Sequence, residues 1–383
     1  MADDFGIYLA VIILIGGAVL AKVAERFKIP YPIPLMVAGL GIKLVIDPAI
    51  FAAIPLSLIA QLTLASVLFY AGLNINMKEL RLSIRSIAIL ATVGVFLTSI
   101  IAGGTIWLAI PGQVGLIGVA FIIGAILTPT DPAALFSVLE SGGVRVKRKL
   151  FSILEGEAVF NDATAVIIVI TVFLPFIVPA LAQPWWIVGG QFIASIALGV
   201  IIGLGIAWGM AKTLLAIEGT TNTSIVTAAT PIIAYGVGEL FAVFGIHPGA
   251  LAAVFAGLFM ANSRSIGLPV LPQKSMRGTM KNVSFVFEII VFIFLGINLD
   301  LAVITPEIIA VGGIVGLLVI LIARPISVFA VTAFDKTMSN RDRFFVSWAG
   351  VKGVASAALA AIVVVELEAG IGGTITSIVF IVV

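Results

Sequence analysis

The sequence predicts an all-α membrane protein with about 13 transmembrane helices, arranged as an inverted-topology repeat. Three observations lead to this fold class. Apolar residues make up 61% of the 383 residues and charged residues only 10%, and the mean hydropathy is +1.26. Apolar stretches long enough to cross a bilayer recur along the whole chain, and the loops between them alternate in charge. This composition excludes a water-soluble domain, so we expect membrane lipids around the chain and no nucleic acid as a partner.

The predicted helices are apolar runs that end at charged residues, proline or glycine. The first follows the acidic residues Asp3 and Asp4 and lacks the basic leading region of a signal peptide, so we expect a retained helix. The last is shorter than a full span, which leaves room for a cytoplasmic tail after Val383. The predicted ranges are 5–25, 31–47, 56–76, 85–110, 114–139, 150–178, 185–213, 221–242, 247–262, 281–298, 302–334, 342–366 and 370–383.

Lysine and arginine gather in every second loop. All but three of the 21 Lys and Arg residues lie at 22–28, 78–85, 145–149, 212, 264–281 and 336–343. The positive-inside rule places these segments on the cytoplasmic side of the membrane. The amino terminus is then outside and, because the number of helices is odd, the carboxyl end is inside. We expect a multi-pass protein of the cell membrane.

The three remaining basic residues are Lys43, Arg324 and Lys352, and the last two lie well within predicted spans. A charged side chain at mid-membrane costs about 3 kcal/mol or more, so each should face the protein interior and have a partner. Lys43 lies near a helix end, and we expect its ammonium group to reach the membrane surface.

Two parts of the chain resemble each other at a fixed offset. Aligning Gly72 in Phe-Tyr-Ala-Gly with Gly296 in Phe-Leu-Gly gives an offset of 224 residues, which places Thr-Pro-Thr-Asp-Pro (128–132) on Lys-Gly-Val-Ala-Ser (352–356). Both segments interrupt a predicted helix, the first through two prolines and the second through nearby glycines. Seven helices separate the copies, so the copies have opposite orientations. We therefore predict two broken helices, the fifth and the twelfth, that cross near mid-membrane.

Four acidic residues lie deep within predicted spans: Asp131, Glu157, Asp162 and Glu288. Glu157 and Asn161 are spaced i, i+4 and share one face of a helix, with Asp162 adjacent. Asp131 lies beside backbone carbonyls that the helix break frees. Oxygen ligands of this kind suit an alkali cation, and buried carboxylates also carry protons. A cation and a proton that compete for one site can be exchanged by alternating access, without ATP or a cofactor.

A buried acid can instead pair with a buried base. We favour this interpretation for Glu157, with Arg324 as its partner, so that the pair ties the sixth helix to the eleventh and leaves Asp162 free to titrate. Lys352 in the second break would offset carboxylate charge or helix-end dipoles. Glu288 has no evident partner, and its role is open. The chain has no cysteine and a single histidine, which leaves an alkali cation as the metal to expect.

These motifs resemble the NhaP-like sodium/proton antiporters of the monovalent cation/proton antiporter-1 family. The matching residues follow the expected order over most of the chain, and their combination is specific. They are Thr-Asp-Pro at 130–132, Glu157 with Phe160-Asn161-Asp162, Phe-Leu-Gly at 294–296, Ala-Arg-Pro at 323–325 and Gly-Val-Lys-Gly at 350–353.

The resemblance implies thirteen helices, a homodimer, and a six-helix core domain that moves against a dimerisation domain. On this chain the core would comprise helices within about 56–178 and 281–366, and the scaffold helices within about 1–47 and 185–262. The implied cation ligands are Asp162, Asp131 and the Thr130 carbonyl, with Asn161 beside them, and the Glu157–Arg324 ion pair supports them. In this family an Asn-Asp pair, as at 161 and 162, goes with electroneutral exchange.

Two departures from the family pattern concern the transported cation. Many relatives have a serine hydroxyl directly after the helix 6 glutamate, where this chain has Ala158, and arginine is common where this chain has Lys352. Exchange of Na⁺ or Li⁺ for H⁺ is the leading hypothesis, with K⁺/H⁺ exchange by the same machinery as the alternative. A sodium-coupled solute symporter would need a roomier polar cavity, and a passive channel a continuous polar pore. No catalytic motif indicates an enzyme.

Overall fold

A computed structural model describes residues 2–27, 29–46, 50, 55–110, 117–131, 139, 146–217, 220–266, 271–299, 301, 303–350, 352–367 and 369–383. These residues form helices and their connections, and none of them forms a strand. The helices of the first half are α1 (Ala2–Arg26), α2 (Pro32–Val45), α3 (Leu56–Asn74), α4 (Met77–Ile89), α5 (Val95–Ala109), α7 (Ile117–Ile126) and α9 (Arg148–Ile167). Those of the second half are α10 (Trp185–Ala216), α11 (Thr220–Glu239), α12 (Gly249–Ala261), α13 (Gln273–Ile297), α14 (Pro306–Leu318), α15 (Arg324–Thr332), α16 (Asn340–Trp348), α17 (Val354–Glu366) and α18 (Ala369–Val382).

Three π-helical segments continue the α-helices without a break. One joins α4 to α5 (Leu90–Gly94), one follows α9 (Ile168–Phe173), and one joins α14 to α15 (Val319–Ala323). Within the described residues, seven continuous helices are long and apolar enough to cross a membrane, and five shorter apolar helices accompany them. Every predicted range contains helix, so the all-helical membrane fold is confirmed. The number of crossings stays a prediction.

Two helices begin earlier than the sequence predicts. The α4 helix begins at Met77 and not at 85, because Asn76 caps it by accepting a hydrogen bond from the Lys78 backbone N–H at 3.0 Å. The α13 helix begins at Gln273 and not at 281. In α4 the charged residues face outward while Leu80 and Ile87 are buried. Charge there marks the exposed face of an amphipathic helix and not a loop.

Both predicted helix breaks are present. The α7 helix ends at Ile126, and residues 128–131 are not helical; Pro132 and the predicted second half of this span lie outside the described residues, apart from Leu139. The second break separates α16, which ends at Trp348, from α17, which begins at Val354. The described residues between these helices, 349–350 and 352–353, are not helical.

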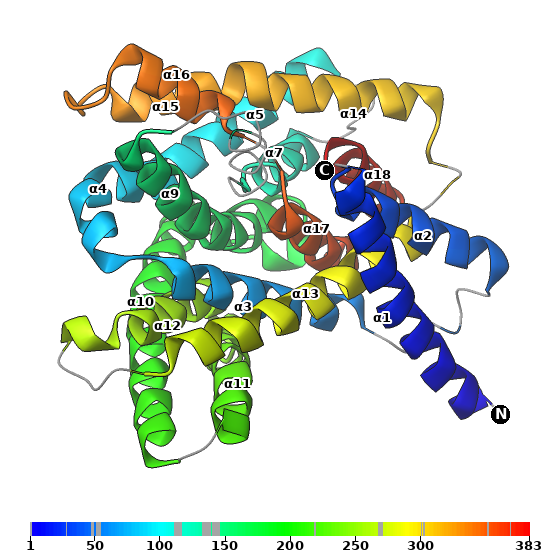
Figure 1. Cartoon of the computed structure of the whole chain (residues 1–383). Helices are drawn as coiled ribbons and strands as arrows, with labels where there is room; N and C mark the ends of the chain where they lie inside the picture. Colours follow the sequence, from blue (N-terminus) through cyan, green and yellow to red (C-terminus); the bar gives the residue numbers. More distant parts are fainter. Residues whose placement is uncertain are drawn as a thin grey trace.

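Equivalent helices of the two halves make equivalent contacts. A Cβ added to Gly72 of α3 would strike the backbone of α12 at Val254, and one added to Gly296 of α13 would strike the backbone of α2 at Met36. The facing glycines are Gly257 on α12 and Gly39 on α2. Figure 1 shows α3 and α13 running across the middle of the molecule, with α9 and α17 above them and α11 below them. Each half therefore packs a central helix against the other half.

The carboxyl ends of these two central helices are bound by side chains from the opposite half. Lys43 at the end of α2 donates a hydrogen bond to the Leu299 carbonyl at 2.5 Å, just after α13. Asn262 after α12 donates to the Ile75 carbonyl at 3.2 Å, just after α3. The Lys43 ammonium group, which we expected to reach the membrane surface, has a carbonyl partner because the end of α13 presents unpaired acceptors.

Candidate cation-binding site

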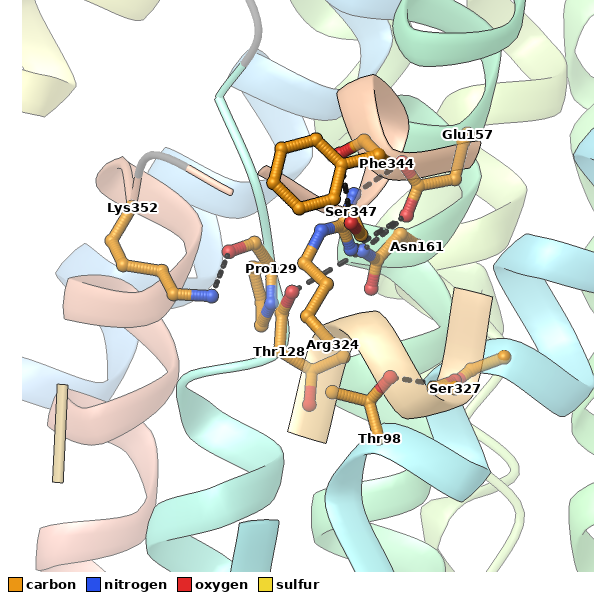
Figure 2. Close-up of polar contacts among 11 residues, drawn as sticks. Thr98, Thr128, Pro129, Glu157, Asn161, Arg324, Ser327, Phe344, Ser347 and Lys352 are labelled. Carbon is orange, nitrogen blue, oxygen red and sulfur yellow. Dashed lines mark hydrogen bonds and ion pairs between the residues drawn. The ribbon is translucent and has the colours of Figure 1, made fainter. Parts of the chain in front are cut away.

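An ion pair links α9 to α15 in the interior. Arg324 donates from Nη1 to Oε1 of Glu157 at 3.1 Å and from Nη2 to Oε2 at 2.9 Å. Only 4% of the Arg324 side chain and 3% of the Glu157 side chain are exposed. The planar guanidinium matches both carboxylate oxygens, a geometry that a lysine ammonium could not provide. The pair therefore holds two helices together and neutralises Glu157 (Figure 2).

Asn161 connects this ion pair to the break after α7. It lies one turn after Glu157 and donates from Nδ2 to Oε1 of Glu157 at 3.0 Å and to the Thr128 carbonyl at 3.2 Å. Asn161 is fully buried, and its Oδ1 has no hydrogen-bond partner among the described residues. The amide group thus uses its donors to hold the broken segment and leaves an oxygen unsatisfied.

Asp162 follows on the same helix and faces the break. Its Oδ1 is buried and likewise has no partner in the described part of the chain. The Thr130 backbone N–H hydrogen-bonds the carboxylate, and the charges of Asp131, Glu157 and Lys352 all reach it. Asp162 therefore lies among the charged groups that the sequence singled out.

The two breaks meet beside Asp131. A Cβ added to Gly353 would lie 2.9 Å from the Asp131 Cβ and 3.4 Å from its Oδ2, so only glycine fits this approach. Lys352 is 8% exposed and donates to the Pro129 carbonyl across the crossing at 3.5 Å. Thr130, 4% exposed, lies between Pro129 and Asp131. The backbone of one break and a side chain of the other thus share one small volume (Figure 2).

This arrangement suits a cation or a proton. A buried acceptor without a donor costs about 1–3 kcal/mol, and two such oxygens, from Asn161 and Asp162, occur on adjacent residues. Carboxylate and amide oxygens are ligands that hard cations prefer. Bound Na⁺ or K⁺, or a proton on Asp162, would satisfy an acceptor that the protein leaves open.

Some polar groups of this region were not singled out by the sequence. Thr128 accepts from Asn161 through its carbonyl, and its hydroxyl lies 3.1 Å from the Ser99 hydroxyl. The position of Thr128 before a helix-breaking proline was the available signal, because a break frees the carbonyls that precede it. Glu288, for which the sequence offered no partner, accepts a hydrogen bond from the Tyr31 hydroxyl at 2.5 Å.

Known antiporters are similar to this chain in sequence. The K⁺/H⁺ antiporter NhaP2 of Shewanella baltica is 28% identical over 323 residues, which cover 82% of this chain and 52% of that protein. The Na⁺/H⁺ antiporter NhaH of Halobacillus dabanensis is 26% identical over 374 residues, covering 93% of this chain and 88% of that protein. The chain thus spans about half the length of the NhaP2 relative and most of the NhaH relative.

A solved structure has the same fold. The sodium proton antiporter MjNhaP1 from Methanocaldococcus jannaschii superposes with a TM-score of 0.83 at 22% sequence identity, over 100% of this chain and 97% of that chain. Residues 10–383 match the family described as "Sodium/hydrogen exchanger, transmembrane". This chain is therefore a multi-pass membrane protein that belongs to the sodium/hydrogen exchanger family.

Proposed function

We propose that this chain is a secondary active antiporter that exchanges a monovalent cation, Na⁺ or Li⁺, for protons. The observation that carries the proposal is the Asp162 carboxylate, whose buried Oδ1 has no partner among the described residues; Asn161, the preceding residue, also carries an oxygen without a partner there. The neighbouring acid Glu157 is neutralised by Arg324. We therefore propose Asp162 as the residue that holds the transported ion.

Asp162, Asp131, the Thr130 carbonyl and Asn161 supply the cation ligands in this proposal. An isolated charge in the membrane interior is costly, so a carboxylate there is stable either beside a cation or protonated. Cation binding then releases a proton, and protonation releases the cation. Lys352, at the crossing of the two breaks, offsets the charge of these acids. Since one cation replaces one proton beside the neutral Asn161, the exchange is electroneutral, and it requires no cofactor.

Alternating access would come from movement of a core, predicted within about 56–178 and 281–366, against a scaffold within about 1–47 and 185–262. The glycine contacts favour a moving boundary on the α9 and α17 side of α3 and α13. Those contacts bring the backbones of α3 and α12, and of α13 and α2, too close for sliding. We therefore narrow the predicted core: α3 and α13, which fall within its ranges, are assigned to the scaffold side of the boundary, and α9, with Asp162, to the moving side.

The charges of the loops and the exposed apolar side chains support a proposal for the orientation of the protein and for its neighbours in the membrane. The alternation of loop charge supports an amino terminus outside and a carboxyl end in the cytoplasm, in the cell membrane. Apolar side chains of α10, such as Trp185, Ile193 and Ile201, are exposed in the single chain. They suit lipid tails and the second copy of a homodimer.

K⁺/H⁺ exchange by the same site is the second candidate. Ala158, which is buried in α9 beside Glu157, supplies no hydroxyl ligand, and a looser ligand set discriminates less against the larger K⁺. The relatives include both a Na⁺/H⁺ and a K⁺/H⁺ antiporter.

Proteoliposomes with an imposed pH gradient test the function. Na⁺, Li⁺ or K⁺ added in turn should dissipate the gradient, with the most effective cation identifying the substrate. Clamping the membrane potential with an ionophore should leave an electroneutral rate unchanged. Asp162→Asn should abolish dissipation, because the amide neither binds a proton nor neutralises a cation. Glu307→Gln, which makes the same chemical change at an exposed position of α14, serves as the matched control.

Three results would contradict the proposal. A wild-type protein that dissipates the gradient with none of the three cations is not a cation/proton antiporter. Retained exchange in a folded Asp162→Asn protein would remove Asp162 from the mechanism. A rate that follows the membrane potential would exclude the electroneutral cycle.

A further inference from the structure

A second buried carboxylate lies outside the site described above, between α2 and α13. Glu288 of α13 accepts a hydrogen bond of 2.5 Å from the hydroxyl of Tyr31, which directly precedes α2. The Tyr31 ring packs edge-on against Phe285 at 6.0 Å and Phe292 at 6.2 Å between ring centroids. Phe285, Glu288 and Phe292 are spaced i, i+3, i+7 and form one face of α13. The ring of Tyr31 thus lies along this face with its hydroxyl on the carboxylate.

The partner of Glu288 is neutral, unlike that of Glu157. Arg324 supplies Glu157 with a full positive charge and two hydrogen bonds, whereas Tyr31 supplies one hydroxyl. A membrane-embedded carboxylate with a neutral partner is not a structural ion pair, and an ionisable residue in such a position is by default a functional candidate. A hydroxyl can also donate to a carboxylate or accept from a carboxylic acid. Tyr31 can therefore remain bonded to Glu288 in either protonation state.

The pair is electrostatically connected to the cation site. The charge of Asp131 acts electrostatically on both Tyr31 and Glu288. Helices packed against α13 carry further described ionisable groups, among them Tyr70 of α3 and Tyr235 and Glu239 of α11. Lys22 and Glu25 of α1 lie near Lys281, Lys43 of α2 is bonded at Leu299, and Glu366 ends α17. Asp131 is thus the acid of the candidate cation site whose charge acts on this pair.

Tyr31 and Glu288 lie in the half of the membrane next to the Lys- and Arg-rich loops, which we call the basic side. Tyr31 follows Lys28 by three residues, and Glu288 follows Lys281 by seven, about 10 Å along a helix. The α3–α13 interface is polar at the same level. Ser284 donates to the Ser66 carbonyl at 3.0 Å, and the Ser66 hydroxyl is buried with no partner in the described residues. Polar groups thus extend from the basic end of α13 to Glu288.

We propose that Glu288 is a further proton-carrying carboxylate of the exchange cycle and that the Tyr31 hydroxyl positions it in both protonation states. The inference rests on the proposed antiport function. When a cation binds from the basic side and displaces a proton from the cation site, the Glu288 carboxylate receives that proton and becomes a carboxylic acid, and it then releases the proton to water on the basic side. In the other half of the cycle the cation leaves on the opposite side of the membrane, and a proton enters the cation site from that side without passing Glu288. On the basic side, the proton would thus leave the cation ligands along a route that the cation does not take.

Glu288→Gln and Tyr31→Phe test this role in proteoliposomes, with Glu288→Asp as the conservative variant. Glu288→Gln should lower the maximal exchange rate about tenfold or more and change the pH profile of the rate, while the apparent KM for the cation stays within about twofold. Glu288→Asp should recover most of the rate. Tyr31→Phe should move the midpoint of the profile with turnover retained. Glu307→Gln and Tyr70→Phe are matched controls, and neither should change the profile.

Infrared difference spectra between acidic and alkaline pH supply a readout that needs no transport. A protonated-carboxyl band should disappear in Glu288→Gln and shift in Tyr31→Phe. If wild-type protein fails to exchange any cation, the proposed function fails whether or not this band is present. Wild-type exchange with an unchanged pH profile and band in Glu288→Gln would overturn the proposal for Glu288 alone. A Glu288→Gln protein with lower thermal stability and an unchanged pH profile of exchange would also overturn the proposal for Glu288, because it would indicate a purely structural pair.

Discussion

Arg324 and Glu157 carry full charges at positions almost without solvent exposure. Removing two ions from water is expensive, and only their mutual attraction and hydrogen bonds compensate for that cost. Asn161 adds a hydrogen bond to the same carboxylate. The loss of either ion would leave the other unpaired in a low-dielectric interior, which is far worse than the loss of both.

We therefore predict that Glu157→Gln and Arg324→Gln each lower the free energy of unfolding by about 3–5 kcal/mol, and that the double variant loses less than the sum. Thermal unfolding in detergent measures this coupling. The exposed Lys22–Glu25 pair, at 2.7 Å on α1, is the control and should show no coupling. Additive losses at Glu157 and Arg324 would mean that the pair does not interact in the folded protein.

Sequence reasoning could pair Glu157 with Arg324 because each is a full charge inside an apolar run and requires an opposite one. It could not find Tyr31 for Glu288. A tyrosine at the start of a helix is common, and its neutral hydroxyl leaves no charge signal in the sequence. The Thr128–Asn161 contact was hidden for a related reason, since every residue has a backbone carbonyl and only the fold decides which one is reached.

At the scale of helices, four glycines set how closely the two halves approach. Gly39 and Gly296 bring α2 onto α13, and Gly72 and Gly257 bring α3 onto α12. In membranes such small residues allow backbones to approach closely, where packing replaces the hydrophobic effect between helices. The helix breaks were predictable from proline and glycine. The starts of α4 and α13 could not be predicted, because charged residues next to an apolar run are also typical of loops.

Gly39→Ala should lower the free energy of unfolding by about 1–3 kcal/mol, because the new Cβ overlaps the Ile293 carbonyl, which is backbone and cannot turn away. Gly41→Ala is the matched control on the same helix, since a Cβ there meets nothing within 4 Å. It should be neutral or slightly stabilising. Thermal midpoints of the two variants compare them directly, and equal midpoints would show that the α2–α13 contact is looser than described.

Across the whole molecule, one end is tied by polar contacts among segments distant in sequence. Lys147, beside α9, bonds Asp342 of α16 at 2.9 Å, Arg148 bonds Glu79 of α4, and Ser86 of α4 donates to Asp335 at 2.5 Å. Asp335 lies in the connection between α15 and α16, outside the membrane-spanning helices. Burial acts to raise its pKa, but hydrogen bonds from Ser86 and Thr337 outweigh burial and hold the pKa at about 2.

A folded-state pKa below the usual value near 4 gives a defined pH dependence. The contribution of Asp335 to stability is fully present above pH 4 and is lost as pH falls towards about 2. We predict that the thermal midpoint of the wild-type protein falls more steeply over this window than that of Asp335→Asn, which cannot titrate. Parallel pH curves for the two proteins would show that Asp335 titrates alike in the folded and unfolded states.

The glycine contacts between the halves also bear on how the protein is made. Gly257 leaves the ribosome 185 residues after Gly72, an interval of about 10–40 s at ordinary rates of synthesis. During that time α3 lacks its partner at Gly72, because α12 has not yet been made. The first half is thus a biosynthetic intermediate that the second half completes. If the two halves are expressed as separate polypeptides, each should be stable only when the other is present.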